Sequence, residues 1–184
     1  KELYSRRMKR FEDAVCLRVP DRVPFLPHFT FFPARYAGIT CEEAMYDCEK
    51  LARAWKKVVL DFEPDMYNSF GNLALGPMLE ALQCRYLKWP GHGVPSRQGY
   101  QFVEGECMKA AEYDDFLFDP TDYVLRKFLP RAYGSLEPLQ KLPSLPSVYY
   151  TRFLTSTAVL GLQDMAEAAH SLLKSGTEAL RIAS

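Results

Sequence analysis

Apolar residues recur at helical spacing in the first part of the chain and then form a short continuous run. A helix is predicted over residues 2–16, because its apolar side chains fall on one stripe at intervals of three to five residues. These side chains are Leu3, Met8, Phe11 and Val15. Residues 23–29 are almost all apolar, which is typical of a strand buried on both faces. Pro20 and Pro24 place a turn between the two, since proline cannot extend a helix.

A second strand is predicted after two more helices. Thr40 and Glu43 have the spacing of a capping box, which predicts that a short helix begins there. Asp47 can cap the next helix, which Pro64 ends. The apolar positions of that helix are Leu51, Trp55, Val58, Val59 and Phe62. Residues 65–69 then have the composition of a strand. The order strand, helices, strand is that of a crossover unit in a parallel sheet.

The middle of the chain departs from this order. Residues 84–88 and 99–103 are predicted to be strands on either side of a turn-rich segment, so we expect an antiparallel hairpin inserted there. The connection that contains Pro130, Pro138 and Pro143 is predicted to be poor in helix. Other helices are predicted over residues 76–82, 112–118, 120–129, 149–160 and 162–182. The tail is therefore expected to be helical.

Composition limits the function classes. Lysine plus arginine equals aspartate plus glutamate at 23 each, so no global charge favours nucleic acid or a membrane surface as a partner. No run approaches the roughly 18 apolar residues of a membrane span, and a cytoplasmic protein is predicted. Five scattered cysteines predict reduced thiols, and their spacing from the three histidines predicts no metal site in this chain.

Several motifs resemble one family when they are taken in order. They are Arg10-x-x-Asp13-Ala14, Pro20-Asp21-Arg22-Val23-Pro24, Arg35-Tyr36, Pro64-Asp65 and Trp89-Pro90-Gly91-His92-Gly93. Together they resemble the N-terminal half of the uroporphyrinogen decarboxylase (URO-D) superfamily. This superfamily includes tetrapyrrole decarboxylases and methyltransferases that serve corrinoid proteins and cobalamin. The stretches around Glu112 and Leu129-Pro130-Arg131 resemble its decarboxylase-like branch in anaerobic microbes.

The resemblance implies a (β/α)8 TIM barrel, which normally needs about 250 residues. The chain has 184, so we expect a single truncated URO-D-like domain over residues 1–184. Its fold class is expected to be α/β, as the incomplete N-terminal portion of a barrel with a β-hairpin insertion and a helical tail. In such a barrel the segment from Val23 to Arg35 would be an inner strand that directs its polar residues into the mouth.

The resemblance also implies the substrate-binding residues, which are His28, Arg35, Tyr36, Asn68 and Ser69. Arg35 and Tyr36 match the last two residues of the family pattern Met-Arg-Gln-Ala-Gly-Arg-Tyr, which holds substrate carboxylates. Phe31 replaces the first arginine of that pattern. Asn68 and Ser69 stand near the place of the family's aspartate, which stabilises a cation, and neither supplies a negative charge.

Arg35 and His28 each have an alternative interpretation. Arg35 is expected either to bind a carboxylate or planar macrocycle, or to pair internally with Glu42 or Glu43. His28 is expected to be either an acid or base at a strand end, or a core histidine.

Three functions follow. The first is a URO-D-like carboxy-lyase that binds a tetrapyrrole or other carboxylated small molecule. The second is a corrinoid- or cobalamin-dependent methyltransferase component with a corrinoid protein as partner, whose zinc would need a His-x-Cys site outside these residues. The third is a noncatalytic fragment or binding module. The chain alone is expected to be inactive and to need no cofactor of its own, and a homodimer is left open.

Overall fold

The computed structural model describes residues 1–67, 73–143 and 158–183. The chain is mostly helical, with one small three-stranded mixed sheet, so the prediction of an incomplete (β/α)8 barrel is wrong. It divides into two compact units, Lys1–Ala74 and Leu75–Ser184, and each is described by itself. None of the helices in the described ranges combines the length and the apolar content needed to cross a membrane.

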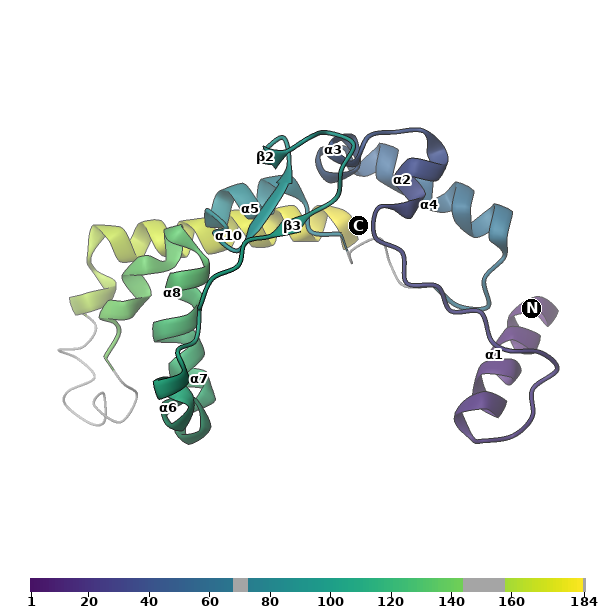
Figure 1. The fold of residues 1–184 in the computed structure, drawn as a ribbon, viewed down its shortest axis with the longest axis horizontal. Helices are drawn as coiled ribbons and strands as arrows, with labels where there is room; N and C mark the ends of the chain where they lie inside the picture. The colour runs from purple at the N-terminus through teal and green to yellow at the C-terminus, as the bar shows by residue number, and fades with distance from the viewer. Residues whose placement is uncertain (68–72, 144–157, 184) are drawn as a thin grey trace. The chain divides into compact units, whose positions relative to one another are not determined.

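The first unit contains four described helices, as Figure 1 shows in purple and blue. They are α1 (Glu2–Val15), α2 (Phe32–Ala37), α3 (Cys41–Tyr46) and α4 (Cys48–Phe62). Three of them begin where the pattern predicts, and the capping box of Thr40 and Glu43 is present at the start of α3. The Asp47 side chain accepts a hydrogen bond from the Lys50 amide and so caps α4. The short helix α2 was not predicted.

The predicted strand over residues 23–29 is wrong. The segment forms no strand, and Val23, Phe25 and Leu26 are exposed. Pro24 and Pro27 remove two amide donors, which prevents a regular ladder. Two backbone bonds nevertheless join this segment to the one after α4, because the amides of Asp65 and Met66 donate to the Phe25 carbonyl at 2.9 and 3.5 Å. Residues 65–67 form no strand either, and residues 68 and 69 lie outside the described residues.

The core of the first unit lies between α2, α3 and α4. In Figure 1, α2 and α4 lie side by side, and the two helices are in contact. Of the apolar residues of α4 predicted to pack inward, Leu51, Trp55 and Val58 are buried in this core, Val59 is partly buried and Phe62 is exposed. Ala34 of α2 and Met45 of α3 complete it from the other side. The core is therefore formed by helices and has no sheet beneath it.

The second unit contains the sheet, in the order β2-β1-β3. β1 (Leu87–Pro90) pairs antiparallel with β3 (Gln101–Phe102), close to the predicted hairpin, and parallel with β2 (Gly93–Val94). Gly93 has φ of 84°, a conformation that glycine adopts without strain. The hairpin insertion is thus present, although its strands are shorter than predicted.

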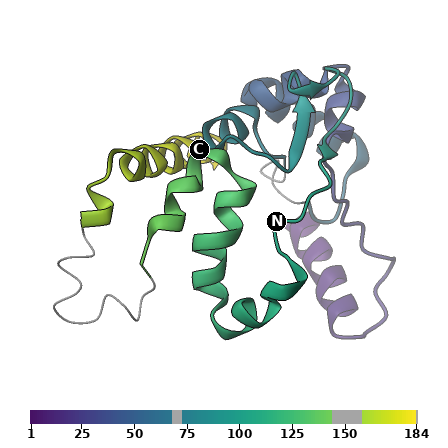
Figure 2. The ribbon, with the colours of Figure 1, turned by 60° about the vertical axis from the view of Figure 1, so that its left-hand side comes forward.

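The rest of the second unit is helical. Figure 2 shows α7, η3 and α8 rising from α6 as nearly one rod. The segments are α5 (Gly76–Leu82), η2 (Ala110–Glu112), α6 (Tyr113–Phe118), α7 (Pro120–Tyr123), the π-helical η3 (Val124–Phe128), α8 (Leu129–Ala132), the 3-10 helix η4 (Gly134–Lys141) and α10 (Gln163–Ala183). The expectation of a helix-poor connection after Pro130 is wrong over η4, which contains Pro138. Most of the helix predicted over residues 149–160 lies outside the described residues.

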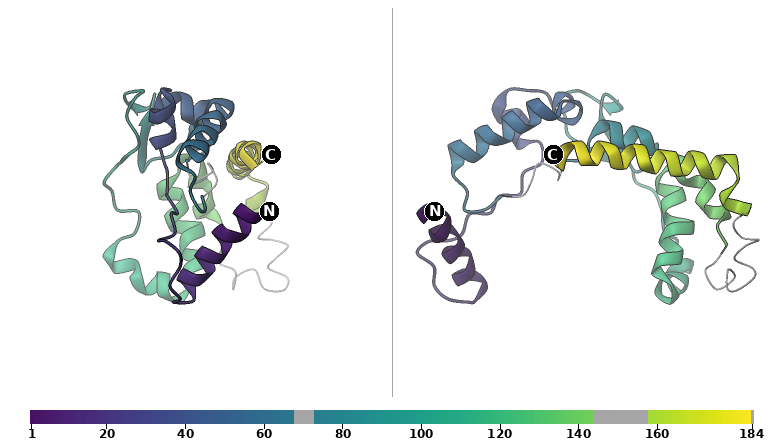
Figure 3. Two further views of the ribbon diagram at one scale, coloured as in Figure 1. Left: turned by 90° about the vertical axis from the view of Figure 1, so that its right-hand side faces the viewer. Right: turned by 180° about the vertical axis from the view of Figure 1, so that it is seen from behind.

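The core of the second unit joins η4 to α10. Leu136 and Leu139 of η4 are buried against Met165 and Ala168 of α10. The right-hand view of Figure 3 shows α10 running alongside α5, and the two helices are in contact. This packing fixes the outward faces of η4 and α10 relative to each other.

Candidate functional site

The structure places three of the five predicted binding residues in the first unit. Arg35 and Tyr36 lie on α2, and His28 lies in the irregular segment before it. All three are exposed, so the alternative of a core histidine at position 28 is wrong. Asn68 and Ser69 lie outside the described residues, so their proximity to Arg35 stays a prediction.

Helix α2 is short and well bounded. Pro33 stands in its first turn, where a missing amide costs nothing. Gly38 ends it in the left-handed conformation, with φ of 81°, and its amide bonds the carbonyls of Ala34 and Arg35. Residues three and four apart on a helix are neighbours, so Arg35 and Tyr36 lie on the same side of α2 as Phe32.

A row of stacked rings forms on this side of α2. The ring of Phe32 stacks on Phe29 with centroids 5.2 Å apart, and on Tyr36 with centroids 5.8 Å apart. Phe62, at the end of α4, meets both Phe32 and Tyr36 edge-on. Trp55 meets Phe29 edge-on at 5.6 Å. We call Phe29, Phe32, Tyr36 and Phe62 the ring cluster.

Tyr36 is fixed by two charged residues of α4. Its hydroxyl donates to Oδ2 of Asp61 at 2.9 Å, and the Lys57 ammonium lies over its ring at 4.9 Å from the centroid. The hydrogen bond to Asp61 raises the pKa of Tyr36, and burial adds to the effect. Because its hydroxyl is engaged by Asp61, Tyr36 offers a ligand its ring rather than its hydroxyl.

Arg35 does not form the ion pair with Glu42 or Glu43 that was its alternative interpretation. Glu43 is occupied by the Thr40 amide at 2.9 Å and by the Lys50 ammonium at 2.6 Å. Within the described ranges, no residue forms a hydrogen bond or an ion pair with the Arg35 side chain. The expected internal partners Glu42 and Glu43 therefore do not neutralise Arg35.

An ionic network that the sequence did not predict joins the motif residues of the first unit. Arg10 is buried on α1, and its guanidinium contacts the carboxylates of Asp21 and Asp65. Arg22 also donates to Oδ1 of Asp65 at 2.7 Å, and the Phe25 amide donates to Oδ2 at 2.9 Å. All four charged residues belong to the motifs described above. The sequence shows their charges, but it does not show which arginine pairs with which aspartate.

The network lowers the pKa of both carboxyl groups. The hydrogen bond from Arg10 lowers the pKa of Asp21 to about 2. Burial raises the pKa of Asp65, but the bonds from the Phe25 amide and Arg10 outweigh it, so the net shift is downward. Through these carboxylates, residues 21–25 and the segment that follows α4 are bound to α1. Their role is therefore structural.

We expect acid to destabilise the chain as these two carboxylates and that of Glu43 become protonated. The pKa of Glu43 is lowered to about 2, and the hydrogen bond from Lys50 is the largest cause. A carboxyl group whose pKa is lower in the folded chain stabilises it above the unfolded value, about 4, and this stabilisation is lost as the pH falls through the folded value. Urea midpoints should therefore be nearly constant from pH 7 to 5 and fall between about pH 4 and 2. A midpoint that rises on acidification would contradict the assignment.

The histidines and cysteines of the described residues are dispersed over both units. No group of three or more histidine, cysteine, aspartate or glutamate residues among them could hold a metal ion. None of the five cysteines forms a disulfide, and Cys41 is buried whereas Cys16 is exposed. The His92 ring instead stacks on Trp89 and contacts Glu80 at 2.9 Å.

We compared the chain with family models, curated proteins and solved structures, and none of them matches it.

Proposed function

We propose that the chain is a URO-D-like protein that binds a planar, carboxylated small molecule of the tetrapyrrole class. The observation that carries the proposal is the exposed Arg35 guanidinium, which has no anionic partner in the described part of the chain and lies on the same side of α2 as the ring cluster. The motif resemblance supplies the ligand class. The proposed site is an open surface, since the barrel mouth that the resemblance implied is absent.

The chemistry of the surface suits such a ligand. A guanidinium binds a carboxylate through two parallel hydrogen bonds, and this geometry is specific as well as strong. Exposed aromatic faces can stack on a flat macrocycle. Phe32, Tyr36 and Phe62 are 42%, 40% and 43% exposed, so part of each ring is accessible to a ligand. The proposal is one of binding, and we expect this chain alone to release no carbon dioxide from uroporphyrinogen.

Cytoplasmic localisation is part of the same proposal. Five cysteines that form no disulfide suit a reducing compartment, in which thiols are not oxidised.

Titration with uroporphyrin tests the proposal. Replacing Arg35 by Gln removes the cation but keeps a hydrogen-bonding side chain, and we expect affinity for uroporphyrin to fall about tenfold, equivalent to about 1.4 kcal/mol. Quenching of porphyrin fluorescence measures it. Arg53→Gln is the matched control, since Arg53 lies on the exposed side of α4 and pairs only with Glu49. This control should bind as the unaltered chain does.

Two outcomes would overturn the proposal. One is equal loss of affinity in Arg35→Gln and Arg53→Gln, which would indicate general attraction of a polyanion. The other is saturable binding of cobalamin with none of uroporphyrin, which would favour the corrinoid alternative because the side chains of cobalamin are amides. Carbon dioxide release by this chain would contradict the claim that it binds without turnover.

A further inference from the structure

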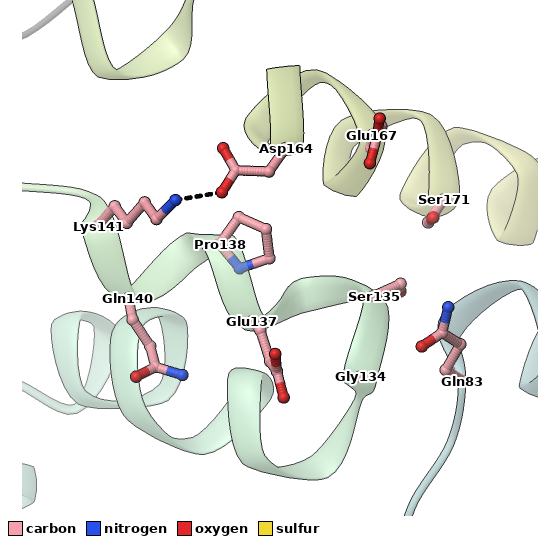
Figure 4. Close-up of a pocket in the computed structure, with 10 residues that line it drawn as sticks. All are labelled: Gln83, Gly134, Ser135, Glu137, Pro138, Gln140, Lys141, Asp164, Glu167 and Ser171. Carbon is pink, nitrogen blue, oxygen red and sulfur yellow. Dashed lines mark hydrogen bonds and ion pairs between the residues drawn. The ribbon is translucent and has the colours of Figure 1, made fainter. Parts of the chain in front are cut away.

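A cavity of about 660 Å³ lies in the second unit, between the end of α5, η4 and α10. Small-molecule sites commonly have volumes of roughly 300 to 1,000 Å³. Figure 4 shows Ser135, Ser171 and the Gln83 amide gathered at one end, and the Lys141–Asp164 ion pair at the other. All the residues that line the cavity belong to the second unit, and none of them belongs to a motif that resembles the URO-D superfamily.

The helical pattern of η4 explains why polar groups line this cavity. Leu136 and Leu139 face the core with Met165 and Ala168. Their neighbours in sequence are thereby turned away from the core, and Ser135, Gln140 and Lys141 line the cavity. Ser171 comes from α10, which the same core holds against η4. The lining residues are thus held by a packed core, which preorganises them for a ligand.

Gly134 allows Gln83 to occupy its place at the edge of the cavity. A Cβ atom at Gly134 would lie 2.7 Å from Oε1 of Gln83, so the end of that flexible side chain would have to move, and it would lie at a tight 3.0 Å from a guanidinium nitrogen of Arg85. The Gly134 amide donates to the Gln83 carbonyl at 3.0 Å, which holds the two residues together. The position of the Gln83 amide therefore depends on the absence of a side chain at residue 134.

Two of the cavity's three carboxylates already have cationic partners, whereas three of its neutral side chains have no hydrogen-bond partner in the described part of the chain. Asp164 is bound by Lys141, and Glu137 by Arg85 at 2.6 Å. By contrast, no side-chain hydrogen bond within the described ranges engages the amides of Gln83 and Gln140 or the hydroxyl of Ser171. Amides and hydroxyls both donate and accept, so they match a ligand whose groups do the same.

We propose that this cavity binds a small neutral polyol of monosaccharide size. Hydroxyl groups of such a ligand can donate to the Gln83 and Gln140 carbonyl oxygens and accept from their NH2 groups. The free lone pairs of Ser135, whose hydroxyl donates to the Leu82 carbonyl at 3.1 Å, add an acceptor. A cationic ligand fits less well, because two of the cavity's three carboxylates already have cationic partners.

Titration of the isotope-labelled chain with D-glucose and with myo-inositol, followed by NMR, tests the proposal. We expect at least one of them to shift the side-chain amide signals of Gln83 and Gln140 in a saturable way. Gln83→Leu and Ser171→Ala should each weaken binding at least tenfold. Gly134→Ala should weaken it too, because it displaces the Gln83 side chain without removing a hydrogen-bonding group. Gln98→Leu, at an exposed position outside the cavity, is the control and should leave binding unchanged.

Several results would overturn the inference. One is the absence of saturable shifts with both polyols. Another is equal binding by Gln83→Leu and Gln98→Leu. The third is tighter binding of spermidine than of either polyol, which would identify a cation site. Circular dichroism of each variant distinguishes lost binding from lost folding, and Gly134→Ala and Ser171→Ala provide independent tests if Gln83→Leu is unfolded.

Discussion

Replacing Asp65 by alanine should lower the free energy of unfolding by about 3 kcal/mol, because it breaks a buried ionic network. The Asp65 side chain is only 2% exposed and contacts the guanidinium groups of Arg10 and Arg22. Without it, buried Arg10 keeps only Asp21, and the Phe25 amide loses its acceptor. Urea unfolding at pH 7, followed by circular dichroism, measures the loss.

The control for this variant is Glu49→Ala. Glu49 is 86% exposed and pairs only with Arg53 on the surface of α4, so its removal should have almost no effect. If Asp65→Ala were as stable as Glu49→Ala, the contacts between α1 and residues 21–25 would not contribute to folding.

Replacing Leu136 by alanine should cost about 3 kcal/mol in the second unit, the middle of the range for a large-to-small change in a core. Leu136 is 1% exposed and packs with Leu139, Met165 and Ala168. The variant loses buried apolar surface and leaves a cavity between η4 and α10, into which the surrounding side chains relax only in part. The shift of the urea midpoint at constant slope measures the effect.

Leu173→Ala is the control, because it makes the same chemical change at an exposed position. It should lower the free energy of unfolding very little. Leu173 lies on α10, the helix that covers Leu136, but is 68% exposed. Equal destabilisation by the two changes would mean that the exposed side of α10 contributes as much to stability as its core side.

The sequence predicted most helices because their signals are local. The capping residues Thr40 and Asp47 satisfy amides within three residues of themselves, and the apolar stripe of α4 needs only one surface to pack against. Such features depend little on the rest of the chain. The prediction of α4 was therefore correct in its cap and for three of the five apolar residues predicted to pack inward.

The strands failed for the opposite reason. An apolar run such as residues 23–29 forms a strand only if neighbouring strands supply partners for its amides and carbonyls, and the pattern contains no information on whether they exist. Here the backbone bonds from Asp65 and Met66 both go to the Phe25 carbonyl, which does not make a ladder. The inference from one apolar run to a whole barrel depended on distant pairing and was wrong.

The candidate site was predictable only in part. Arg35 and Tyr36 were found from a motif, and they do lie together on α2. The partners of Tyr36 on α4 and the cavity beside η4 could not be predicted, since both require the packing of segments far apart in sequence. The Gly134 contact with Gln83 is of the same kind.

The attachment of α1 has a thermodynamic consequence. The buried residues of this helix are Arg10 and Asp13, both charged, and no apolar side chain of α1 is fully buried. Detaching the helix therefore exposes little hydrocarbon, and its contribution to the heat capacity change is small. On cooling, cores that depend on apolar burial lose part of their driving force, and this loss affects the contacts of α1 little because they bury little hydrocarbon.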